Sequence, residues 1–372
     1  MDAPLFIGSE IYRGSSYGPH HPLRVPRVPT VTDLARSLGW LAPGQFRQSP
    51  RARPAALTAF HTPEYVAALE RAEQTQAVDA ATRARHGLGT LSNPVFPEMF
   101  RRPATAAGGS LLAAELVAGG GAVYNPGGGT HHGMADRAAG FCYLNDPVLA
   151  LSRLRALGLT RLAYVDIDAH HADGVEAAFA GVEGMVLVST HEEGRWPFTG
   201  ALEDRAGGVA VNLPLPRGAH DGDFARALDE VILPAVARHR PEAIVLQCGA
   251  DAVAEDPLSR LAWSNRSHVR AVRALRPLAP RMIVLGGGGY NPWSVGRAWA
   301  SVWAALAGHE IPDRLPEAAE AVLRGLSWSH RLGWNPPEHW FTTLLDAPRE
   351  AAPTPGVAER VAALRARLRA AH

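Results

Sequence analysis

Four short segments, far apart in this chain of 372 residues, gather residue types that can hold metal ions and move protons. They are residues 127–133, 166–173, 249–251 and 286–290. Together they contain carboxylates, adjacent histidines, runs of glycine and a tyrosine, a set that can activate a water on a metal for attack on an amide. Each segment follows an apolar run typical of a strand, and ligands of α/β proteins bind where parallel strands end.

The candidate metal ligands are Asp168, His170 and Asp251. Asp168 and His170 are two residues apart, so on an extended segment both side chains would face one side. Asp251 ends another predicted strand and can converge on them. Two carboxylates and one imidazole leave positions open for water and substrate, which is typical of a catalytic site. The set favours zinc, although iron(II) and cobalt also suit it; for either aspartate alone, a helix cap is the alternative role.

Two adjacent histidines, His131 and His132, follow a triple-glycine turn, where the backbone can approach a reacting group closely. Asp166 and Asp173 are candidate partners that would orient the two imidazoles and raise their basicity. Such pairs could supply a base that deprotonates water and an acid that protonates a leaving amine. For the two histidines, further metal ligation or an ordinary turn are the alternatives.

Tyr290 closes a run of four glycines and could donate a hydrogen bond to the oxyanion of a tetrahedral intermediate. A nucleotide-binding loop is the alternative for this run. The chain has no lysine, which a P-loop needs, and the run lacks the glycine spacing of a dinucleotide site.

The elements that must position these residues alternate between strand and helix. This pattern predicts one α/β domain of three layers, α/β/α, with a central, mainly parallel sheet and the catalytic loops at the C-terminal strand ends. The predicted strands are residues 4–12, 122–125, 161–166, 185–190, 209–213, 243–248 and 282–285. The predicted helices are residues 104–118, 147–156, 221–238, 267–275 and 295–306.

Two regions differ from this alternation. Residues 13–60 are rich in proline and arginine with few strand signals, which predicts loops and a helix over one rim. After several prolines, an Arg/Ala-rich helix is predicted from about Val357. We therefore divide the chain into a catalytic domain over residues 1–345 and a helical tail over 346–372. For the tail we favour a solvated helix over an oligomer contact. The sequence leaves open whether the protein forms a homo-oligomer.

The composition excludes some function classes. A net charge of +1 with 20% charged residues argues against a nucleic-acid binder. Cys142 and Cys248 are too few for a disulfide framework and favour a reducing compartment. The N-terminus lacks a secretory pattern, and no apolar run reaches the ~20 residues that cross a bilayer. We expect a cytoplasmic protein with neither nucleic-acid nor membrane partners.

The chain resembles the histone deacetylase family, within the arginase/deacetylase fold, and in particular its bacterial acetoin-utilisation-type members. The likeness runs from about residue 5 to 310 and depends on residues 127–133, 140–146, 164–175, 249–257 and 285–291. It implies one zinc ion held by Asp168, His170 and Asp251. It also implies His131 and His132 as the tandem histidines with Asp166 and Asp173 as partners, and Tyr290 as the residue that stabilises the transition state.

The resemblance implies roles for further residues. Phe141 and Trp196 would wall the acyl tunnel, Gly140 would line it, and Arg27 would guard an exit channel beneath the site. A structural potassium ion is implied as well. Its ligands would be Asp166, Asp168, His170, Ser189 and Thr190.

Four positions depart from related patterns. Ser92 stands on the rim loop where family members often carry an aspartate that grips the substrate backbone, and a hydroxyl holds backbone N–H groups less strongly than a carboxylate. Phe198 stands beside Trp196 where a smaller residue is common, which predicts a narrower or more apolar mouth. Ala172 and Val253 occupy positions where arginases carry the ligands of a second metal, which argues against ureohydrolase activity.

The resulting hypothesis is zinc-dependent hydrolysis of acylated amines, with N-ε-acyl-lysine in proteins or peptides as substrate. The alternative substrate is an acetylpolyamine or another small acyl-amine. A hypothesis of a different class is a non-catalytic binder of acylated ligands, which the presence of every catalytic position disfavours. The sequence does not distinguish between acetyl, propionyl, lactyl and longer acyl groups as the group removed, because they would differ only in the tunnel length they need.

Overall fold

One parallel sheet forms the centre of the molecule. In the computed structural model, which describes residues 3–370, eight strands follow the order β2-β1-β3-β8-β7-β4-β5-β6, and every pairing between them is parallel. The strands are β1 (Leu5–Gly8), β2 (Phe46–Gln48), β3 (Gly121–Asn125), β4 (Leu162–Asp166), β5 (Met185–Glu192), β6 (Ala210–Leu215), β7 (Ala243–Gln247) and β8 (Arg281–Leu285). Several are buried along their whole length, as expected of a sheet covered on both faces.

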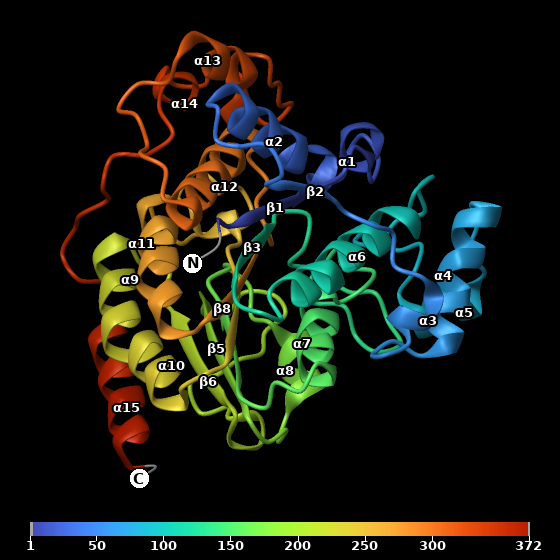
Figure 1. Cartoon of the computed structure of the whole chain (residues 1–372), viewed down its shortest axis with the longest axis horizontal. Coiled ribbons are helices and arrows are strands. Elements are labelled where there is room, and N and C mark those ends of the chain that lie inside the picture. The colour runs from blue at the N-terminus through green and yellow to red at the C-terminus, as the bar shows by residue number, and fades with distance from the viewer. Residues whose placement is uncertain (1–2, 371–372) are drawn as a thin grey trace.

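Helices cover both faces of the sheet, which gives the predicted α/β/α layers (Figure 1). One layer contains α2 (Arg27–Ser37), α9 (Asp221–Ala227), α10 (Leu233–His239), α11 (Arg266–Leu275) and α12 (Pro292–Ala307). The opposite layer contains α6 (Arg101–Leu116), α7 (Asp146–Ala156) and α8 (Asp173–Phe179). The remaining helices are α1 (Ile11–Gly14), α3 (Pro54–Leu57), α4 (Pro63–Thr75), α5 (Ala80–His86), α13 (Glu317–Arg324), α14 (His339–Thr342) and α15 (Val357–Ala370).

The side chains of β4 show how the sheet joins the two layers. Ala163 and Val165 pack with the α9–α12 layer, whereas Leu162 and Tyr164 pack with the α6–α8 layer. Successive residues of a strand point to opposite faces, so an almost continuous apolar run supplies both cores at once.

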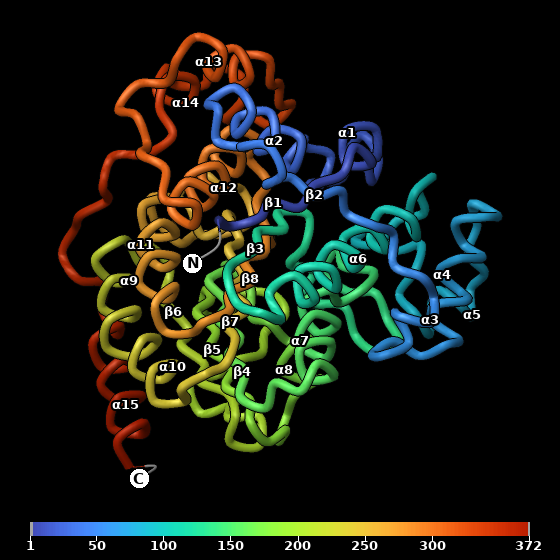
Figure 2. The backbone as a smooth tube through the Cα atoms, in the orientation of Figure 1, coloured from blue at the N-terminus to red at the C-terminus, as the bar shows by residue number. Residues whose placement is uncertain are grey.

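The strands that precede the four chemical segments are neighbours in the sheet. Their order is β3-β8-β7-β4, near the middle of the sheet (Figure 2). Their last residues are also in register, since Asn125 pairs with Leu285, Leu285 with Gln247, and Gln247 with Asp166. The four segments therefore leave the sheet side by side along one edge.

The structure confirms the α/β architecture and corrects two predictions for the N-terminal region. The first strand ends at Gly8 rather than at residue 12, because the chain turns into α1. Residues 13–60 contain the predicted helix, α2, but also the edge strand β2, which is three residues long and only partly buried. A strand so short carries too few residues for an alternation of apolar and polar positions to show.

The predicted C-terminal helix is present as α15 and packs on the domain. Val357, Val361 and Leu364 are buried in the same core cluster as α9 and α10, while much of the opposite face is exposed. The tail helix is thus solvated on one face only, which corrects the expectation of a free solvated helix. The division of the chain at residue 345 stays a prediction. Within residues 3–370, no helix is long and apolar enough to cross a membrane.

Candidate active site

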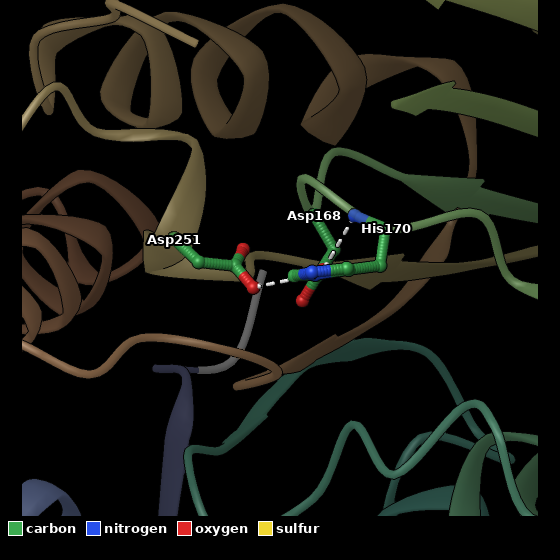
Figure 3. Close-up of side chains that lie close together, drawn as sticks. All are labelled: Asp168, His170 and Asp251. Carbon is green, nitrogen blue, oxygen red and sulfur yellow. Dashed lines mark hydrogen bonds and ion pairs between the residues drawn. The ribbon is translucent and has the colours of Figure 1, made fainter. Parts of the chain in front are cut away.

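The three predicted metal ligands meet at the edge of the sheet. Asp168 and His170 lie in the loop after β4, and Asp251 lies in the short turn after β7 (Figure 3). His170 Nδ1 is 2.9 Å from Asp251 Oδ2 and 3.2 Å from Asp168 Oδ1. One potential ligand atom from each residue lies within 4.8 Å of the others, and all three residues are buried.

The charges of this cluster fit a cation. Burial opposes a charge on His170, but Asp251 and Asp168 outweigh it and raise the pKa of the imidazole to about 10. Burial and the nearby charge of Asp168 raise the pKa of Asp251. Two buried carboxylates around one imidazole need positive charge between them, and a divalent ion can supply it in place of a proton. The oxygen and nitrogen donors suit zinc and similar divalent metals.

Backbone amides and glycines complete the cluster. Asp168 Oδ2 accepts a hydrogen bond from the Gly288 N–H at 2.7 Å, and Asp251 Oδ1 accepts one from Ala169 N–H at 3.0 Å. A Cβ atom at Gly249 would lie 2.0 Å from Asp168 Oδ2, and one at Gly288 would lie 2.0 Å from Asp251 Oδ2. The glycine runs are therefore needed because the carboxylates occupy the space of a side chain.

The tandem histidines each face the predicted aspartate. His131 Nδ1 lies 2.7 Å from Asp166 Oδ2, and His132 Nδ1 lies 2.6 Å from Asp173 Oδ1. The two ring centroids are 3.9 Å apart. A carboxylate at Nδ1 favours a proton on that nitrogen and leaves Nε2 available for chemistry.

The two imidazoles differ in their affinity for a proton. Burial opposes a charge on His131, but Asp166 and Asp168 outweigh it and raise its pKa to about 9. Burial and the charge of His131 lower the pKa of His132 to about 4, against the opposing effect of Asp173. Two adjacent groups with pKa values pushed apart can serve as an acid and a base at the same pH.

Tyr290 lines a cavity that also borders Asp168, His170 and the tandem histidines. Its backbone N–H donates to Asp256 Oδ2 at 2.6 Å, and its ring centroid is 5.7 Å from that of Phe141. Among residues 3–370, its hydroxyl has no hydrogen-bond partner, which leaves the group available to a ligand. Asp256 therefore fixes the backbone that carries this phenol.

The predicted tunnel residues line the approach to the cluster. Phe141 and Trp196 border a mouth of about 520 Å³ together with Ser92 and Phe198. Gly140 has a φ of +52°, and a Cβ there would lie 2.4 Å from the Trp196 ring. The Phe198 side chain is 73% exposed at this mouth, and a narrower or more apolar mouth than in related proteins stays a prediction.

Two buried histidines that sequence reasoning missed hold the loop of Trp196. His171 Nδ1 lies 2.8 Å from Thr199 Oγ1, and His191 Nε2 lies 2.8 Å from the Gly200 carbonyl oxygen. Their ring centroids are 4.9 Å apart. Each follows a recognised motif residue, but a single histidine has no spacing that would reveal a contact with a distant loop.

The supporting roles of other residues were also not predicted from the sequence. The Asp146 carboxylate accepts hydrogen bonds from the backbone N–H groups of Gly129 and Thr130 at 3.0 and 2.8 Å. His61 Nε2 accepts the N–H of Asn145 at 2.9 Å. These contacts hold the loop of the tandem histidines, and they join residues that are 16 to 84 positions apart in the chain.

The remaining predicted residues lie near the cluster. Arg27 Nη1 donates to the Gly287 carbonyl oxygen at 2.5 Å, directly beside the glycine that holds Asp168. Ser189 pairs with Asp166 across the β4–β5 ladder, and Thr190 Oγ1 donates to the Asp166 carbonyl oxygen at 3.4 Å. Every predicted site residue thus lies at or beside one edge of the sheet.

Comparisons with known proteins give a consistent result. Residues 21–306 match the family model of the histone deacetylase domain. The acetoin utilization protein AcuC of Bacillus subtilis is 33% identical over 330 residues, which cover 84% of this chain and 85% of the relative. Histone deacetylase 9 of Arabidopsis thaliana is 35% identical over 314 residues, 82% of this chain and 73% of the relative.

Solved structures agree in fold. A crystal structure of an HDAC homologue from Aquifex aeolicus has a TM-score of 0.92 and 32% identity, and the match covers 98% of this chain and 100% of the other. A structure of an HDAC homologue complexed with SAHA has a TM-score of 0.93, also with 32% identity, 98% of this chain and 100% of the other.

Proposed function

The chain belongs to the histone deacetylase family and is a deacetylase, and on that premise we propose that it removes acetyl or related short acyl groups from the ε-amine of lysine in a zinc-dependent reaction. One observation carries the proposal: Asp168 and His170, which form one cluster with Asp251, line a cavity together with the imidazoles of two His–Asp pairs and a phenol that has no hydrogen-bond partner within residues 3–370.

Asp168, His170 and Asp251 would hold the zinc ion. When bound, zinc supplies a Lewis acid that polarises the acyl carbonyl and lowers the pKa of water toward ~7. The water oxygen forms the new C–O bond, the amide C–N bond breaks, and the amine leaves with a proton.

His131 and His132 would move the protons. His132 has the lower pKa and lies beside Trp196, with ring centroids 4.6 Å apart, so it is neutral at pH 7 and able to accept a proton from water. His131 has the raised pKa, to which the buried Asp166 at its Nδ1 contributes, and it would stabilise negative charge beside it. The two Nδ1 contacts with aspartate keep both rings oriented.

Tyr290 would donate its hydroxyl to the oxyanion. Its pKa is raised well above the ordinary value by burial and by the charge of Asp251, so the phenol keeps its proton at neutral pH. Phe141 and Trp196 would hold the lysine stem between them, while Gly140 leaves room for Trp196. Ser92 at the mouth would contact the substrate backbone.

A structural potassium ion beside the cluster is part of the proposal. Asp166, Ser189 and Thr190 would hold it together with Asp168 and His170. The pairing of Asp166 with Ser189 across the ladder supports this, because it places Ser189 of β5 beside Asp166, the last residue of β4. A cytoplasmic location stays a prediction.

Small acyl-amines are the second candidate substrates. Ser92, in place of an acidic rim residue, favours them because a peptide backbone would be held less strongly. A non-catalytic acyl-ligand binder is disfavoured, since every proposed catalytic position is filled.

A substrate panel tests the proposal. Zinc-loaded protein is offered an acetyl-lysine peptide, N-acetylputrescine and N-acetylspermidine, and free amine is measured. We expect the highest kcat/KM on the peptide. Faster turnover of the polyamines would make small acyl-amines the substrate class instead. No turnover of any of the three compounds would refute the enzymatic proposal. The Asp251→Asn variant serves as the inactive control.

A further inference from the structure

A surface groove of about 740 Å³ opens beside the mouth of the active site. It lies between residues 17–22, α5 and residues 89–95, and its volume falls within the ~300–1,000 Å³ of typical ligand sites. Much of its lining is apolar, with contributions from Pro19, Pro22, Val78, Leu91, Pro94 and Val95. The proposed reaction uses none of these residues, so the groove has no role assigned so far.

The groove and the mouth share a wall. His21 lines the groove, and its ring centroid is 4.5 Å from that of Phe141, which lines the mouth. Tyr17, also in the groove, donates its hydroxyl to the Phe141 carbonyl oxygen at 3.4 Å. His21 Nε2 lies 3.2 Å from the carbonyl oxygen of Ser92, another residue of the mouth. A chain that leaves the mouth past Ser92 therefore enters the groove.

The loop between the groove and the mouth is closed by hydrogen bonds. Gly89 N–H donates to the Asn93 carbonyl oxygen at 2.8 Å, and Asn93 N–H donates to Thr90 Oγ1 at 3.1 Å. Leu91 lies within this loop and is 97% exposed. A single exposed leucine is common on protein surfaces. Leu91, however, lines the groove and directly precedes Ser92 of the mouth, so it presents an apolar contact at the border of both.

The charge of the groove is positive. Arg83 of α5 is exposed and lines the groove, and its guanidinium has no ion pair or hydrogen bond within residues 3–370. No aspartate or glutamate is among the lining residues that the structure describes. Burial lowers the pKa of His21 to about 4, which leaves this imidazole neutral at pH 7. An unpaired guanidinium beside apolar surface suits a carboxylate carried by an otherwise apolar chain.

We propose that this groove binds the residues of a substrate peptide that flank the acyl-lysine, with Leu91 in contact with an apolar side chain and Arg83 with an acidic one. The shared wall with the mouth and the unpaired positive charge select this occupant. The inference rests on the proposed function and deepens it. It favours a peptide or protein substrate, because a small acyl-amine has no flanking residues to place in the groove.

The reach of a peptide fits this arrangement. Leu91 and Ser92 are consecutive residues, whose Cα atoms are about 3.8 Å apart, and an extended peptide advances roughly 3.3 Å per residue. The residue next to the acyl-lysine can therefore contact Leu91, and residues further along can approach Arg83. Contacts so far from the reacting atoms stabilise the bound substrate and the transition state equally, so they should change KM rather than kcat.

The test compares substrates that carry the same acetyl-lysine. One is acetyl-lysine blocked at both ends, without flanking residues. The others are peptides with leucine next to the acetyl-lysine and glutamate, glutamine or lysine beyond it, in one set on the N-terminal side and in a second set on the C-terminal side. In one of the two sets we expect kcat/KM of the wild type to be about two- to fivefold higher for glutamate than for glutamine, the scale of an exposed ion pair, and lowest for lysine.

Variants of the groove identify the contacts. Arg83→Met should remove the preference for glutamate, and Arg83→Lys should retain part of it. Arg85→Met changes an exposed arginine of the same helix that does not line the groove, so this matched control should keep the preference. Leu91→Ser should lower the ratio of kcat/KM for the peptides to that for blocked acetyl-lysine by about threefold or more, through KM. This ratio cancels any effect on the chemical step.

The outcomes separate this inference from the proposed function. If the wild type hydrolyses the glutamate, glutamine and lysine peptides equally in both sets, or if Arg83→Met keeps the preference, the role of Arg83 is refuted. An unchanged ratio in Leu91→Ser refutes the apolar contact. In these cases hydrolysis of blocked acetyl-lysine still upholds the proposed function. If the wild type hydrolyses neither blocked acetyl-lysine nor any peptide, the proposed function fails, and the substrate groove fails with it.

Discussion

The two carboxylates proposed to bind the metal are each fixed by a backbone amide of another loop. Asp168 accepts from Gly288, and Asp251 accepts from Ala169, so the loops after β4, β7 and β8 hold one another in place. A carboxylate oriented this way loses little freedom when it binds a metal. The site is therefore preorganised by contacts that involve no ion.

The hydroxyl of Tyr290 is the most specific test at the residue scale. Tyr290→Phe removes the proposed oxyanion donor and leaves the ring, its contact with Phe141 and the backbone bond to Asp256 unchanged. We expect kcat to fall by ~10²–10³-fold, with unchanged metal content by elemental analysis. Turnover equal to that of the wild type would exclude this role.

His61 predicts how stability depends on pH. Burial lowers its pKa to about 4, and its Nε2 must stay unprotonated to accept the Asn145 N–H. The unfolded chain binds this proton near pH 6.5 and the folded chain only near pH 4, so stability is lost as the pH falls between these values. The total loss from this group is about 3 kcal/mol.

Urea unfolding at several pH values measures this effect. In His61→Gln, the unfolding free energy should fall less steeply between pH 6.5 and 4. The difference in slope from the wild type should correspond to at most one bound proton. An identical slope in the variant and the wild type would show that His61 does not contribute.

Sequence reasoning found the residues that are proposed to react but not those that support them. Asp168, His170, Asp251 and the tandem histidines stand in short motifs after strands, where spacing and residue type point to chemistry. His61 is a single residue within an ordinary segment, and its partner Asn145 lies 84 residues away in the chain. Such contacts arise from tertiary packing, which no local pattern records.

At the scale of elements, the site depends on four loops that leave one edge of the sheet together. The apolar runs of β3, β4, β7 and β8 were predicted because strands buried on both faces are recognisable from composition. Their order in the sheet was not predicted, because it depends on long-range pairing. The edge strand β2 was not predicted, because it is only three residues long.

The glycine loop after β8 gives a prediction at this scale. A Cβ at Gly288 would meet Asp251 Oδ2 at 2.0 Å, so Gly288→Ala should displace the carboxylate and abolish zinc binding. Gly119→Ala is the control, because no atom lies within 4 Å of a Cβ there. Calorimetric zinc titration of both variants measures the effect, and normal affinity in Gly288→Ala would contradict the need for a glycine at this position.

At the scale of the whole molecule, one continuous core joins the sheet to the C-terminal helix. Leu364 of α15 is fully buried in the cluster that contains α9 and α10, and Arg360 donates to the Pro214 carbonyl oxygen on β6 at 2.8 Å. The sequence predicted this helix but not its docking, because three buried residues on an Arg/Ala-rich helix give a weak apolar stripe.

The central claim is that one divalent ion at Asp168, His170 and Asp251 enables amide hydrolysis, and metal reconstitution tests it most directly. Chelator-treated protein is titrated with zinc while metal binding and acetyl-lysine hydrolysis are followed together. We predict that activity is lost on chelation and returns in proportion to one zinc ion bound per chain, and that His170→Ala neither binds zinc tightly nor regains activity. Full hydrolysis by the metal-free protein, or zinc binding that His170→Ala leaves unchanged, would contradict the account.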